Sequence, residues 1–539
     1  MKKVILFLFA IQAFSLFAQK GNEDVLKMSN IKATQTLGMI DYFYVDTTDL
    51  NKICEKGIEA MLKELDPHSV FIDKDEVAKM NEPLVGNFDG IGVSFQLLDD
   101  TIHVVDVISG GPSEKVGVLA GDKIVKVDDM PATGDTIKND WVFKHLRGKK
   151  GTKVSVSVIR GKSKTPIVFE IKRDKIPINS IDTWFMIDKE IGYIRLNRFA
   201  QSSNEEMVQA ITELQSEGMQ SLILDLRGNG GGYLNVAVDI CDQFLSGDKL
   251  IVYTKGAKSP RQELKAQKKG LFEQGRLVIM VDESSASASE ILSGAVQDWD
   301  RGVIVARRTF GKGLVQRPFD MYDGSQIRLT TSRYYTPSGR CIQKPYDAGV
   351  EEYQMDYYNR LSHGELLSAD SVHFADSLRC FTSGNRLVYG GGGIMPDVFV
   401  PSDTMGVTSY YMNVVNADLL QNFAFEYADL NRADLTKAKT VGQLLRRLPS
   451  DGLLLSSFVY YASQKGVPAR WYYINISRTL IVNQLKAIIA RNILGWNAFY
   501  EVLNSHDPVV LEAIKQLHAG TDPLTLDAMK DIKKAQSKK

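Results

Sequence analysis

The sequence predicts an α/β multidomain protein, and three observations support this prediction. The chain has 539 residues, more than the ~100–200 residues typical of one domain. Between residues 190 and 335, apolar strand-like runs alternate with amphipathic helical stretches, a pattern typical of a largely parallel sheet that helices cover. Residues 84–175 instead hold short β-type runs between glycine-rich turns, which predicts a smaller, mostly β domain.

Composition excludes several classes of protein. Apolar residues make up 44% of the chain and charged residues 24%, which excludes a disordered chain, a fibre and a polytopic membrane protein. Lysine and arginine together number 65, as do aspartate and glutamate, so the net charge is zero. This balance argues against a nucleic-acid-binding protein. Four cysteines are too few for a disulfide scaffold and lack the spacing of metal ligands. Whether Cys341 and Cys380 pair stays open.

The start of the chain predicts export. Lys2 and Lys3 precede an almost continuous apolar run over residues 4–17, and Ala18 offers a small residue for cleavage. The run is shorter than the ~20 residues that a membrane span needs. We therefore expect residues 1–18 to be a signal peptide and the mature protein to be soluble, in the periplasm or associated with the cell envelope. The alternative is an uncleaved anchor.

The other elements are predicted from periodicity and turn residues. Residues 24–65 have a helical period, which Asp66-Pro67 ends. One short helix fits at residues 137–147, inside the β-rich segment. A polar, irregular insertion is expected at about residues 340–390, and helices dominate after residue 405. The predicted strands are 91–97, 102–108, 123–128, 153–159, 167–172, 191–196, 221–226, 276–282 and 302–307. The remaining predicted helices are 204–217, 288–299, 416–430, 439–447, 452–465, 473–492 and 508–518.

The stretch with the strongest chemical character is residues 282–316. A strand ends there, a Ser/Ala-rich turn follows, and a helix begins at about residue 288. The start of a helix exposes unpaired N–H groups and a partial positive charge. A serine held at that point has donors near it that could receive a developing oxyanion. Taken alone, the turn is better explained by serine as a common N-cap and by Ser/Ala runs as ordinary turns.

A nucleophilic serine needs a base. None of the seven histidines lies in the α/β block. Folding could bring His68 of "LDPHS" close to the serine, but we expect His68 to stabilise a turn instead. A desolvated lysine is the other option, and Lys312 stands between two glycines in "TFGKGLVQ". If residues 313–317 are extended, positions 312, 314 and 316 share a face, so Gln316 could hold the lysine amine.

Two further features bear on the site. Asp298 lies 11 residues after Ser287 (298 − 287), which is ~16 Å along a helix, so it is expected to brace the loop beyond the helix.

The turn "RGNGGG" at residues 227–232 could present bare N–H groups to an anion, but it lacks the spacing of the nucleotide-binding motifs. The interpretation that joins it to the serine is an oxyanion hole formed by the N–H groups of Gly231 and Ala288. The alternative is a plain tight turn.

Together these motifs resemble the C-terminal processing peptidases, or tail-specific proteases, which use a Ser-Lys dyad. The resemblance covers about residues 35–402. It rests on "LDPHS" (65–69), "FDGIGVSF" (88–95), "GGPSEKVGVLAGDKIVKVDD" (110–129), "LDLRGNGGG" (224–232), "ESSASASEILSGAVQDWDRGVIVARRTFGKGLVQ" (283–316) and "GGGGIMPDV" (390–398). It implies a crotonase/ClpP-like α/β protease core with an inserted PDZ domain and helical N- and C-terminal regions.

The resemblance also implies roles for individual residues. Ser287 corresponds to the nucleophile, Lys312 to the general base and Gln316 to the residue that orients the lysine. The backbone N–H groups of Gly231 and Ala288 correspond to the oxyanion donors, and Asp298 matches an acidic position with a supporting role. No metal or other cofactor is expected.

The β-rich segment resembles a PDZ domain, with "GIGV" in place of the carboxylate-binding loop. The N–H groups of Ile91, Gly92 and Val93 would receive a substrate's terminal carboxylate, and the substrate would add as a strand. Val142 and Leu146 would line the apolar pocket beside the loop. The alternative is a PDZ domain that serves only as a structural gate.

The expected organisation is a signal peptide (1–18), a helical region (19–83), the PDZ domain (84–175), the protease core (176–404) and a helical extension (405–539). The expected function is a serine endopeptidase that processes or degrades exported proteins from their C-termini. Its expected partners are protein substrates with apolar C-terminal tails, with no nucleic acid and no membrane span after signal removal; a homo-oligomer or an adaptor stays open. Two alternatives remain: a PDZ binding module that never cuts, and a Ser-His hydrolase that uses His68.

Overall fold

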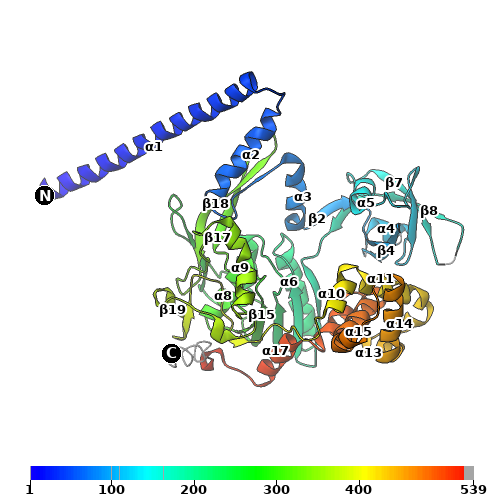
Figure 1. Ribbon diagram of the computed structural model, residues 1–539. Helices are drawn as coiled ribbons and strands as arrows, with labels where there is room; N and C mark the ends of the chain where they lie inside the picture. Colours follow the sequence, from blue (N-terminus) through cyan, green and yellow to red (C-terminus); the bar gives the residue numbers. More distant parts are fainter. Residues whose placement is uncertain (1, 99, 109, 162, 527–539) are drawn as a thin grey trace. The chain divides into compact units, whose positions relative to one another are not determined.

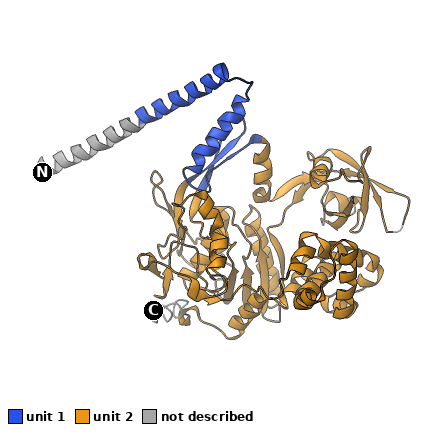
Figure 2. Ribbon diagram, viewed as in Figure 1, with its two compact units in different colours: residues 1–74, 316–330 blue, residues 75–315, 331–539 orange. Residues whose placement is uncertain are grey.

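The computed structural model describes residues 2–98, 100–108, 110–161 and 163–526, with side chains from residue 23 onward. The chain divides into two compact units, residues 1–74 with 316–330 and residues 75–315 with 331–539 (Figure 2). The predicted signal peptide lies outside the described side chains, so it stays a prediction. Within the described part of the chain, every helix falls short of the length or the apolarity that a bilayer-spanning helix requires.

The first unit combines the start of the chain with a later strand pair (Figure 1). Its elements are α1 (Lys2–Phe43), α2 (Leu50–Lys63), β1 (Val70–Ile72), and the parts of β17 (Leu314–Asp320) and β18 (Gln326–Tyr335) that fall within residues 316–330. The prediction of helix throughout residues 24–65 is wrong in the middle. Helix α1 ends at Phe43, and Asp49 begins a new helix as its N-cap, accepting a hydrogen bond from the Lys52 N–H at 3.1 Å.

A six-stranded sheet forms the centre of the second unit, in the order β10-β11-β12-β15-β16-β21. Strands β11 to β21 are parallel and β10 runs antiparallel to β11, which confirms the predicted largely parallel sheet. The strands are β10 (Ile181–Met186), β11 (Ile191–Leu196), β12 (Ser221–Asp225), β15 (Arg276–Val281), β16 (Val303–Ala306) and β21 (Val398–Phe399).

Both faces of this sheet are covered, which explains its nearly continuous apolar strands. One face packs in a core with α6 (Ser203–Ser216), α7 (Leu234–Cys241) and α8 (Ala288–Asp298). On the other face, Tyr193, Ile223 and Val278 pack in a core that also includes Val510 of α17 (Pro508–His518). Helix α17 therefore completes the core of the sheet. A second pair of strands, β13 (Leu250–Lys255) and β14 (Gln262–Lys265), is antiparallel, and β13 also pairs with residues 333–335 of β18.

The β-rich segment begins and ends in paired strands, β2 (Asn87–Gly90) and β9 (Asp174–Pro177), after α3 (Lys74–Val85). Its sheet has the order β3-β4-β5-β7-β8, so β3 lies at one end. The elements that confirm the predicted strands and helix are β3 (Val93–Leu98), β4 (Thr101–Val107), β5 (Lys123–Val127), α5 (Asn139–Leu146), β7 (Lys153–Ile159) and β8 (Ile167–Lys172). The short α4 (Pro112–Val116) and β6 (Met130–Pro131) were not predicted.

The expectation that residues 340–390 are irregular is wrong in part, because helix α9 (Val350–Ser362) lies inside this range. Its glutamates at positions 351 and 352 lie in the first turn, where their negative charges interact favourably with the helix dipole. The rest of the insertion consists of short pieces: η1 (Ala369–Ser371), η2 (Asp376–Leu378), β19 (Arg379–Phe381) and β20 (Leu387–Tyr389). All four cysteines of the chain are free thiols.

A helical part follows with an apolar core of its own. It contains α10 (Ser409–Asn416), α11 (Leu419–Leu430), α12 (Arg432–Leu435), α13 (Val441–Leu445), α14 (Asp451–Gln464), α15 (Trp471–Leu494) and α16 (Trp496–Asn504); η3 (Pro523–Thr525) comes after α17. Helix α16 also contacts the edge strand β10, because Asn497 accepts a hydrogen bond from the Thr183 hydroxyl at 2.6 Å and donates to the Trp184 carbonyl at 3.0 Å.

Candidate active site

Ser287 stands in the tight connection between β15 and α8, at the N-cap position of the helix. Its backbone angles, φ 56° and ψ −110°, lie outside the regions that a non-glycine residue normally adopts. Residues held in such conformations cost ~1–3 kcal/mol and persist only where the surrounding structure imposes them. The side chain is half-buried, so it is held in place and still accessible.

The glycine-rich turn between β12 and α7 lies directly against Ser287. The carbonyl of Asn229 accepts hydrogen bonds from the Ala286 N–H at 3.0 Å and from the Ser289 hydroxyl at 2.9 Å. A Cβ built on Gly231 would lie 2.9 Å from the Cβ of Ser287 and 3.0 Å from the Ala288 nitrogen. The structure therefore brings Gly231, Ser287 and Ala288 together, and a larger residue than glycine would not fit at position 231.

The two predicted oxyanion donors differ in their present hydrogen bonding. The Gly231 N–H donates to Oδ1 of Asn229 at 2.9 Å, so it is directed at a side chain of its own turn. Ala288 is the first residue of α8, where N–H groups have no partner within the helix. For Gly231 to receive an oxyanion, its N–H must exchange Asn229 for the substrate. Both donor roles stay predictions.

Glu290 holds the main chains of Ser287 and Lys312 next to each other. Its Oε2 accepts hydrogen bonds from the Ser287 N–H at 2.8 Å and from the Lys312 N–H at 2.9 Å. Its Oε1 accepts from the Gly311 N–H at 2.7 Å and from the Thr309 hydroxyl at 2.6 Å. The carboxyl is fully buried, and burial raises the pKa of Glu290 while these hydrogen bonds oppose the increase. The predicted nucleophile and the predicted base thus share one anchor.

Tyr334 forms a second link between the same two residues. Its hydroxyl is within hydrogen-bond distance of the Ser287 carbonyl, at 3.0 Å, and of the Lys312 carbonyl. Its N–H donates to the Gly313 carbonyl at 3.0 Å. Burial raises the pKa of Tyr334, which is 1% exposed and stays a neutral phenol. The turn that carries Ser287 and the loop that carries Lys312 are therefore fastened on two sides.

The insertion fixes the lysine loop from a third direction. Arg360 of α9 donates to the carbonyls of Thr309 at 2.8 Å and Phe310 at 2.9 Å, and only 3% of it is exposed. The Gln343 side chain accepts a hydrogen bond from the Gly313 N–H at 2.8 Å. Because these contacts surround Lys312, the segment that the sequence predicted to be irregular positions the candidate base.

Gln316 belongs to the first unit, where it joins the "LDPHS" motif in one network. Its Nε2 donates to the Thr330 hydroxyl at 3.1 Å, and that hydroxyl donates to Oδ1 of Asp66 at 3.1 Å. Asp66 also accepts hydrogen bonds from the N–H groups of His68 at 2.8 Å and Ser69 at 2.9 Å, so the motif forms a capped turn. That Gln316 orients Lys312 stays a prediction, and so does the alternative that His68 is the base.

Asp298 forms a buried ion pair at the far end of α8. Its Oδ1 accepts a hydrogen bond from Nη2 of Arg340 at 2.7 Å, and its Oδ2 accepts from the Ser338 N–H at 3.0 Å. The side chains of Asp298 and Arg340 are 0% and 1% exposed. The residue therefore binds the loop that leads into the insertion.

All five predicted tail-binding residues line one small apolar pocket in the β-rich segment. Its volume is about 40 Å³, enough for a small apolar group. The carbonyl of Ile91 accepts from the Ser113 N–H at 3.0 Å, and the carbonyl of Gly92 accepts from the Ile108 N–H at 3.0 Å. Across a trans peptide bond the N–H points opposite to the C=O, so the N–H groups of Gly92 and Val93 point away from those partners. The lining residues are Phe88, Ile91, Gly92, Val93, Phe95, Val142, Phe143, Leu146 and Arg147.

Sequence reasoning missed three residues that build the site: Glu290, Tyr334 and Asn229. A signal for Glu290 existed, because a serine followed three residues later by glutamate at a helix start is the capping-box pattern. Tyr334 lies 47 residues from Ser287 in the chain, and no local pattern links the two. Among the described residues, no group of three or more His, Cys, Asp or Glu side chains could hold a metal ion.

Comparison with protein families gives three matches along the chain. Residues 190–352 match peptidase family S41, and residues 90–171 match the PDZ domain. Residues 410–495 match a family of unknown function (DUF8443). The match to family S41 includes Ser287, Lys312 and the Gly231 turn.

Relatives of the chain are bacterial proteases. The chain is 35% identical over 305 residues to the carboxy-terminal-processing protease of Bartonella bacilliformis, covering 56% of this chain and 69% of that protein. It is 31% identical over 342 residues to a probable CtpA-like serine protease of Staphylococcus aureus, covering 63% of this chain and 66% of that protein. Among solved structures, the photosystem II D1 C-terminal processing protease is 28% identical, with a TM-score of 0.33, over 57% of this chain and 89% of that chain.

Proposed function

Because this chain belongs to peptidase family S41, the carboxy-terminal-processing serine proteases, we propose that Ser287 is its nucleophile and Lys312 its general base. The observation that supports this pair is their common anchoring. Glu290 accepts from the N–H groups of both residues, and the Tyr334 hydroxyl lies against both carbonyls. A nucleophile and a base need such a fixed mutual position, because proton transfer requires hydrogen-bond reach.

The reaction follows from these roles. The neutral amine of Lys312 takes the proton of the Ser287 hydroxyl as its oxygen attacks the peptide carbonyl. The N–H groups of Ala288 and Gly231 stabilise the tetrahedral oxyanion, each worth ~3–4 kcal/mol in comparable sites. Lys312 then returns the proton to the leaving amine, and an acyl-enzyme forms on Ser287. A water molecule, deprotonated in its turn by Lys312, hydrolyses this ester and frees the serine.

In this proposal the PDZ domain captures the substrate tail. The N–H groups of residues 91–93 receive the terminal carboxylate, and the last side chain enters the pocket formed with Val142 and Leu146. The tail adds as a strand to β3, which lies at the end of its sheet. The substrates would be exported proteins with apolar C-terminal tails. The N-terminal segment, with its two lysines and apolar run, would direct the enzyme to the periplasm or cell envelope.

The decisive experiment uses a peptide with an apolar C-terminal tail and measures its cleavage by the full chain. Cleavage should disappear in Ser287→Ala and in Lys312→Ala, while His68→Ala should retain it. Loss in His68→Ala together with turnover in Lys312→Ala would instead support a Ser-His hydrolase. A wild-type chain that binds the peptide without ever cutting it would support the binding-module alternative.

A further inference from the structure

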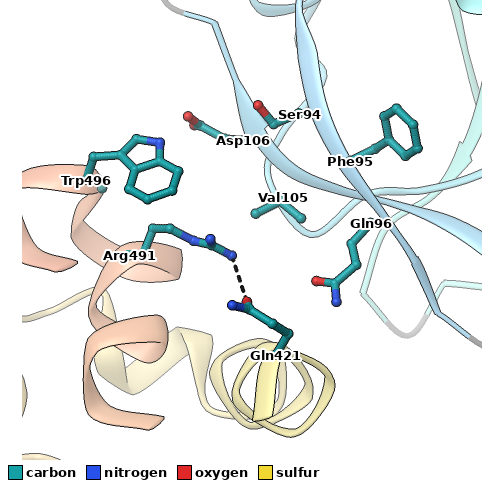
Figure 3. Close-up of a pocket in the computed structure, with 9 residues that line it drawn as sticks. Ser94, Phe95, Gln96, Val105, Asp106, Gln421, Arg491 and Trp496 are labelled. Atoms are coloured by element: carbon teal, nitrogen blue, oxygen red, sulfur yellow. Dashed lines mark hydrogen bonds between the residues drawn. The ribbon is translucent and has the colours of Figure 1, made fainter. Parts of the chain in front are cut away.

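A second pocket lies where the PDZ domain meets the helical part of the chain. Its volume is about 260 Å³. In Figure 3, Arg491 and Gln421 approach it from the helices, Ser94, Val105 and Asp106 face it from β3 and β4, and Phe95 points away. Gln96 fixes the two parts together, since its Nε2 donates to the Asn422 side chain at 2.8 Å. The lining residues are Ser94, Phe95, Gln96, Val105, Asp106, Gln421, Arg491, Gly495 and Trp496.

The charge that dominates this pocket is the Arg491 guanidinium. Burial lowers the pKa of Arg491, which reflects the cost of holding its positive charge away from water. Nη2 donates to Oε1 of Gln421 at 3.2 Å, and the group lies 5.0 Å from the centre of the Trp496 ring. Nε is buried with no hydrogen-bond partner. Within the described part of the chain, the ion pairs closer than 4.0 Å do not include Arg491. The charge of Asp106 opposes the decrease in the pKa of Arg491 only in part. A desolvated cation with no ion pair at close range favours the binding of an anion.

Asp106 does not fill this role. It faces the pocket from β4 but is exposed to solvent, and its Oδ1 accepts a hydrogen bond from the Val107 N–H at 2.9 Å. Solvent screens an exposed carboxylate, so it compensates a partly buried charge only weakly. Its repulsion of an incoming anion is screened for the same reason. A carboxylate that contacts the Arg491 guanidinium directly would therefore neutralise it more fully than Asp106 does.

The strand β3 relates this pocket to the tail-binding pocket. Val93 and Phe95 line the apolar pocket, and Ser94 and Gln96 line the Arg491 pocket. A strand added beside β3 presents its own side chains alternately to the same two faces. If the last and third-last residues of the tail face the apolar pocket, the second-last and fourth-last residues face Arg491.

We propose that the Arg491 pocket binds an acidic side chain, glutamate or aspartate, at the second-last or fourth-last position of the substrate tail. This proposal rests on the capture of the tail by the PDZ domain proposed above. The helical part, whose family has no assigned function, thereby takes part in substrate selection. The preferred tail alternates an apolar residue for the first pocket with an acidic residue for the second.

The test measures binding of fluorescein-labelled peptides to the full-length Ser287→Ala chain by fluorescence anisotropy. Two peptides share an apolar last residue and carry either glutamate or glutamine at the second-last and fourth-last positions. A third has glutamate and an amidated C-terminus. We expect the glutamate peptide to bind about 10- to 100-fold more tightly than the glutamine peptide, the range for hydrogen bonds to charged groups. Arg491→Gln should abolish this difference, and Arg491→Lys should retain part of it. Arg478→Gln, an exposed arginine of the same helix, should leave it unchanged.

The outcomes separate the two proposals. Equal affinity for glutamate and glutamine peptides, with loss of binding on amidation, would overturn the acidic subsite and leave tail capture standing. A glutamate preference that persists in Arg491→Gln would also overturn it. Binding that is indifferent to amidation would overturn tail capture itself. Because the peptide comparison uses unaltered Arg491, equal affinities there would overturn the acidic subsite even if Arg491→Gln fails to fold, and Arg491→Lys then tests the role of the guanidinium.

Discussion

The main-chain N–H groups of Ser287 and Lys312 donate to the same atom, Oε2 of Glu290, at 2.8 and 2.9 Å. The two residues are 25 positions apart (312 − 287) and lie on different loops. A shared acceptor ties those loops together through main-chain groups and uses neither the serine nor the lysine side chain. Glu290 therefore positions the main chains of Ser287 and Lys312 relative to each other.

Glu290→Gln should reduce kcat about 10²-fold or more, since misplacing reacting groups by about 1 Å has that effect. Each carboxylate oxygen accepts two hydrogen bonds. A glutamine has one oxygen and one NH₂ group. In one orientation the NH₂ faces the N–H groups of Ser287 and Lys312; in the other it faces the Gly311 N–H and the Thr309 hydroxyl, which can turn to accept. One or two orphaned donors cost about 1–6 kcal/mol of unfolding free energy. Steady-state kinetics and chemical denaturation measure the two effects.

A matched control for Glu290→Gln is Ser293→Ala, one turn further along α8. The Ser293 hydroxyl donates to the Ser289 carbonyl at 2.8 Å and is equally buried. This variant should lose about 1 kcal/mol of stability and keep its kcat. Equal kcat in the wild type and Glu290→Gln would contradict the positioning role.

The sequence predicted the sheet and the β-rich segment well because both follow from local apolar patterns. Periodicity cannot show where a distant helix docks: residues 508–518 were predicted as a helix, but not that Val510 would complete the core behind β12 and β15. Helix α9 was missed because its polar sequence resembles a loop. Arg360 of α9 holds the lysine loop by donating to main-chain carbonyls about 50 residues away in the chain. No sequence pattern predicts such a contact.

For the site, the sequence could supply the candidates for the chemistry, but not the residues that hold those candidates in place. Ser287 and Lys312 stand in recognisable turns. Tyr334 and Asn229 act through hydrogen bonds to main-chain groups, which any side chain with a hydroxyl or amide could make at many positions. The hydrogen bond from the Gly231 N–H to the Asn229 side chain likewise depends on the folded geometry and could not be predicted from the sequence.

Gly231→Ala should reduce kcat by about 10²–10³-fold, the loss seen when an oxyanion donor is removed. Position 231 has φ +103°, which disfavours a Cβ, and the new methyl would lie 2.8 Å from the Ala286 carbonyl oxygen. The backbone must shift, which moves the N–H away from Ser287. Gly230→Ala is the control, because a Cβ there meets nothing within 4 Å. Peptide cleavage by both variants measures the difference, and full activity in Gly231→Ala would refute the donor role.

Asp298→Asn should destabilise the chain without removing its chemistry. An asparagine cannot neutralise the buried Arg340, and breaking a buried ion pair costs about 3–5 kcal/mol. The kcat measured well below the melting temperature should stay far above the ~10⁴-fold loss expected for a triad acid. Asp300→Asn is the control: it breaks the pair with Arg386, but Arg386 keeps its ion pair with Asp397, so this variant should lose less stability and likewise keep its kcat. A loss of kcat confined to Asp298→Asn would show a catalytic role.

Leu146→Ala should change which tail the PDZ domain prefers. The pocket of about 40 Å³ accepts a small apolar residue, and shortening Leu146 enlarges it. The affinity ratio for peptides ending in leucine and alanine should shift toward leucine by about 10-fold or more, since one methylene is worth 10- to 200-fold in such pockets. Val154→Ala, which removes a buried side chain outside the pocket, should reduce stability and leave the ratio unchanged. An unchanged ratio in Leu146→Ala would place the tail elsewhere.

Asp225 makes the stability of the core depend on acid pH. Burial alone would raise the pKa of Asp225, but the guanidiniums of Arg227 and Arg195 outweigh it and hold that pKa far below its usual range. The unfolded chain, with an aspartate pKa of about 3.9, therefore takes up this proton first as the pH falls. The resulting stability is fully present above about pH 4 and is lost as the pH falls through the folded pKa.

Asp225→Asn should consequently be most harmful at neutral pH, where it costs about 3–5 kcal/mol by leaving Arg227 and Arg195 without their shared carboxylate. The difference in unfolding free energy between the wild type and the variant should shrink steadily below about pH 4. Denaturation curves recorded at several pH values measure this difference. Asp507→Asn removes the other, more exposed partner of Arg227 and should cost less at every pH. The difference in unfolding free energy between the wild type and Asp225→Asn could instead stay constant down to the lowest measurable pH. That result would mean that the two arginines do not hold Asp225 ionised.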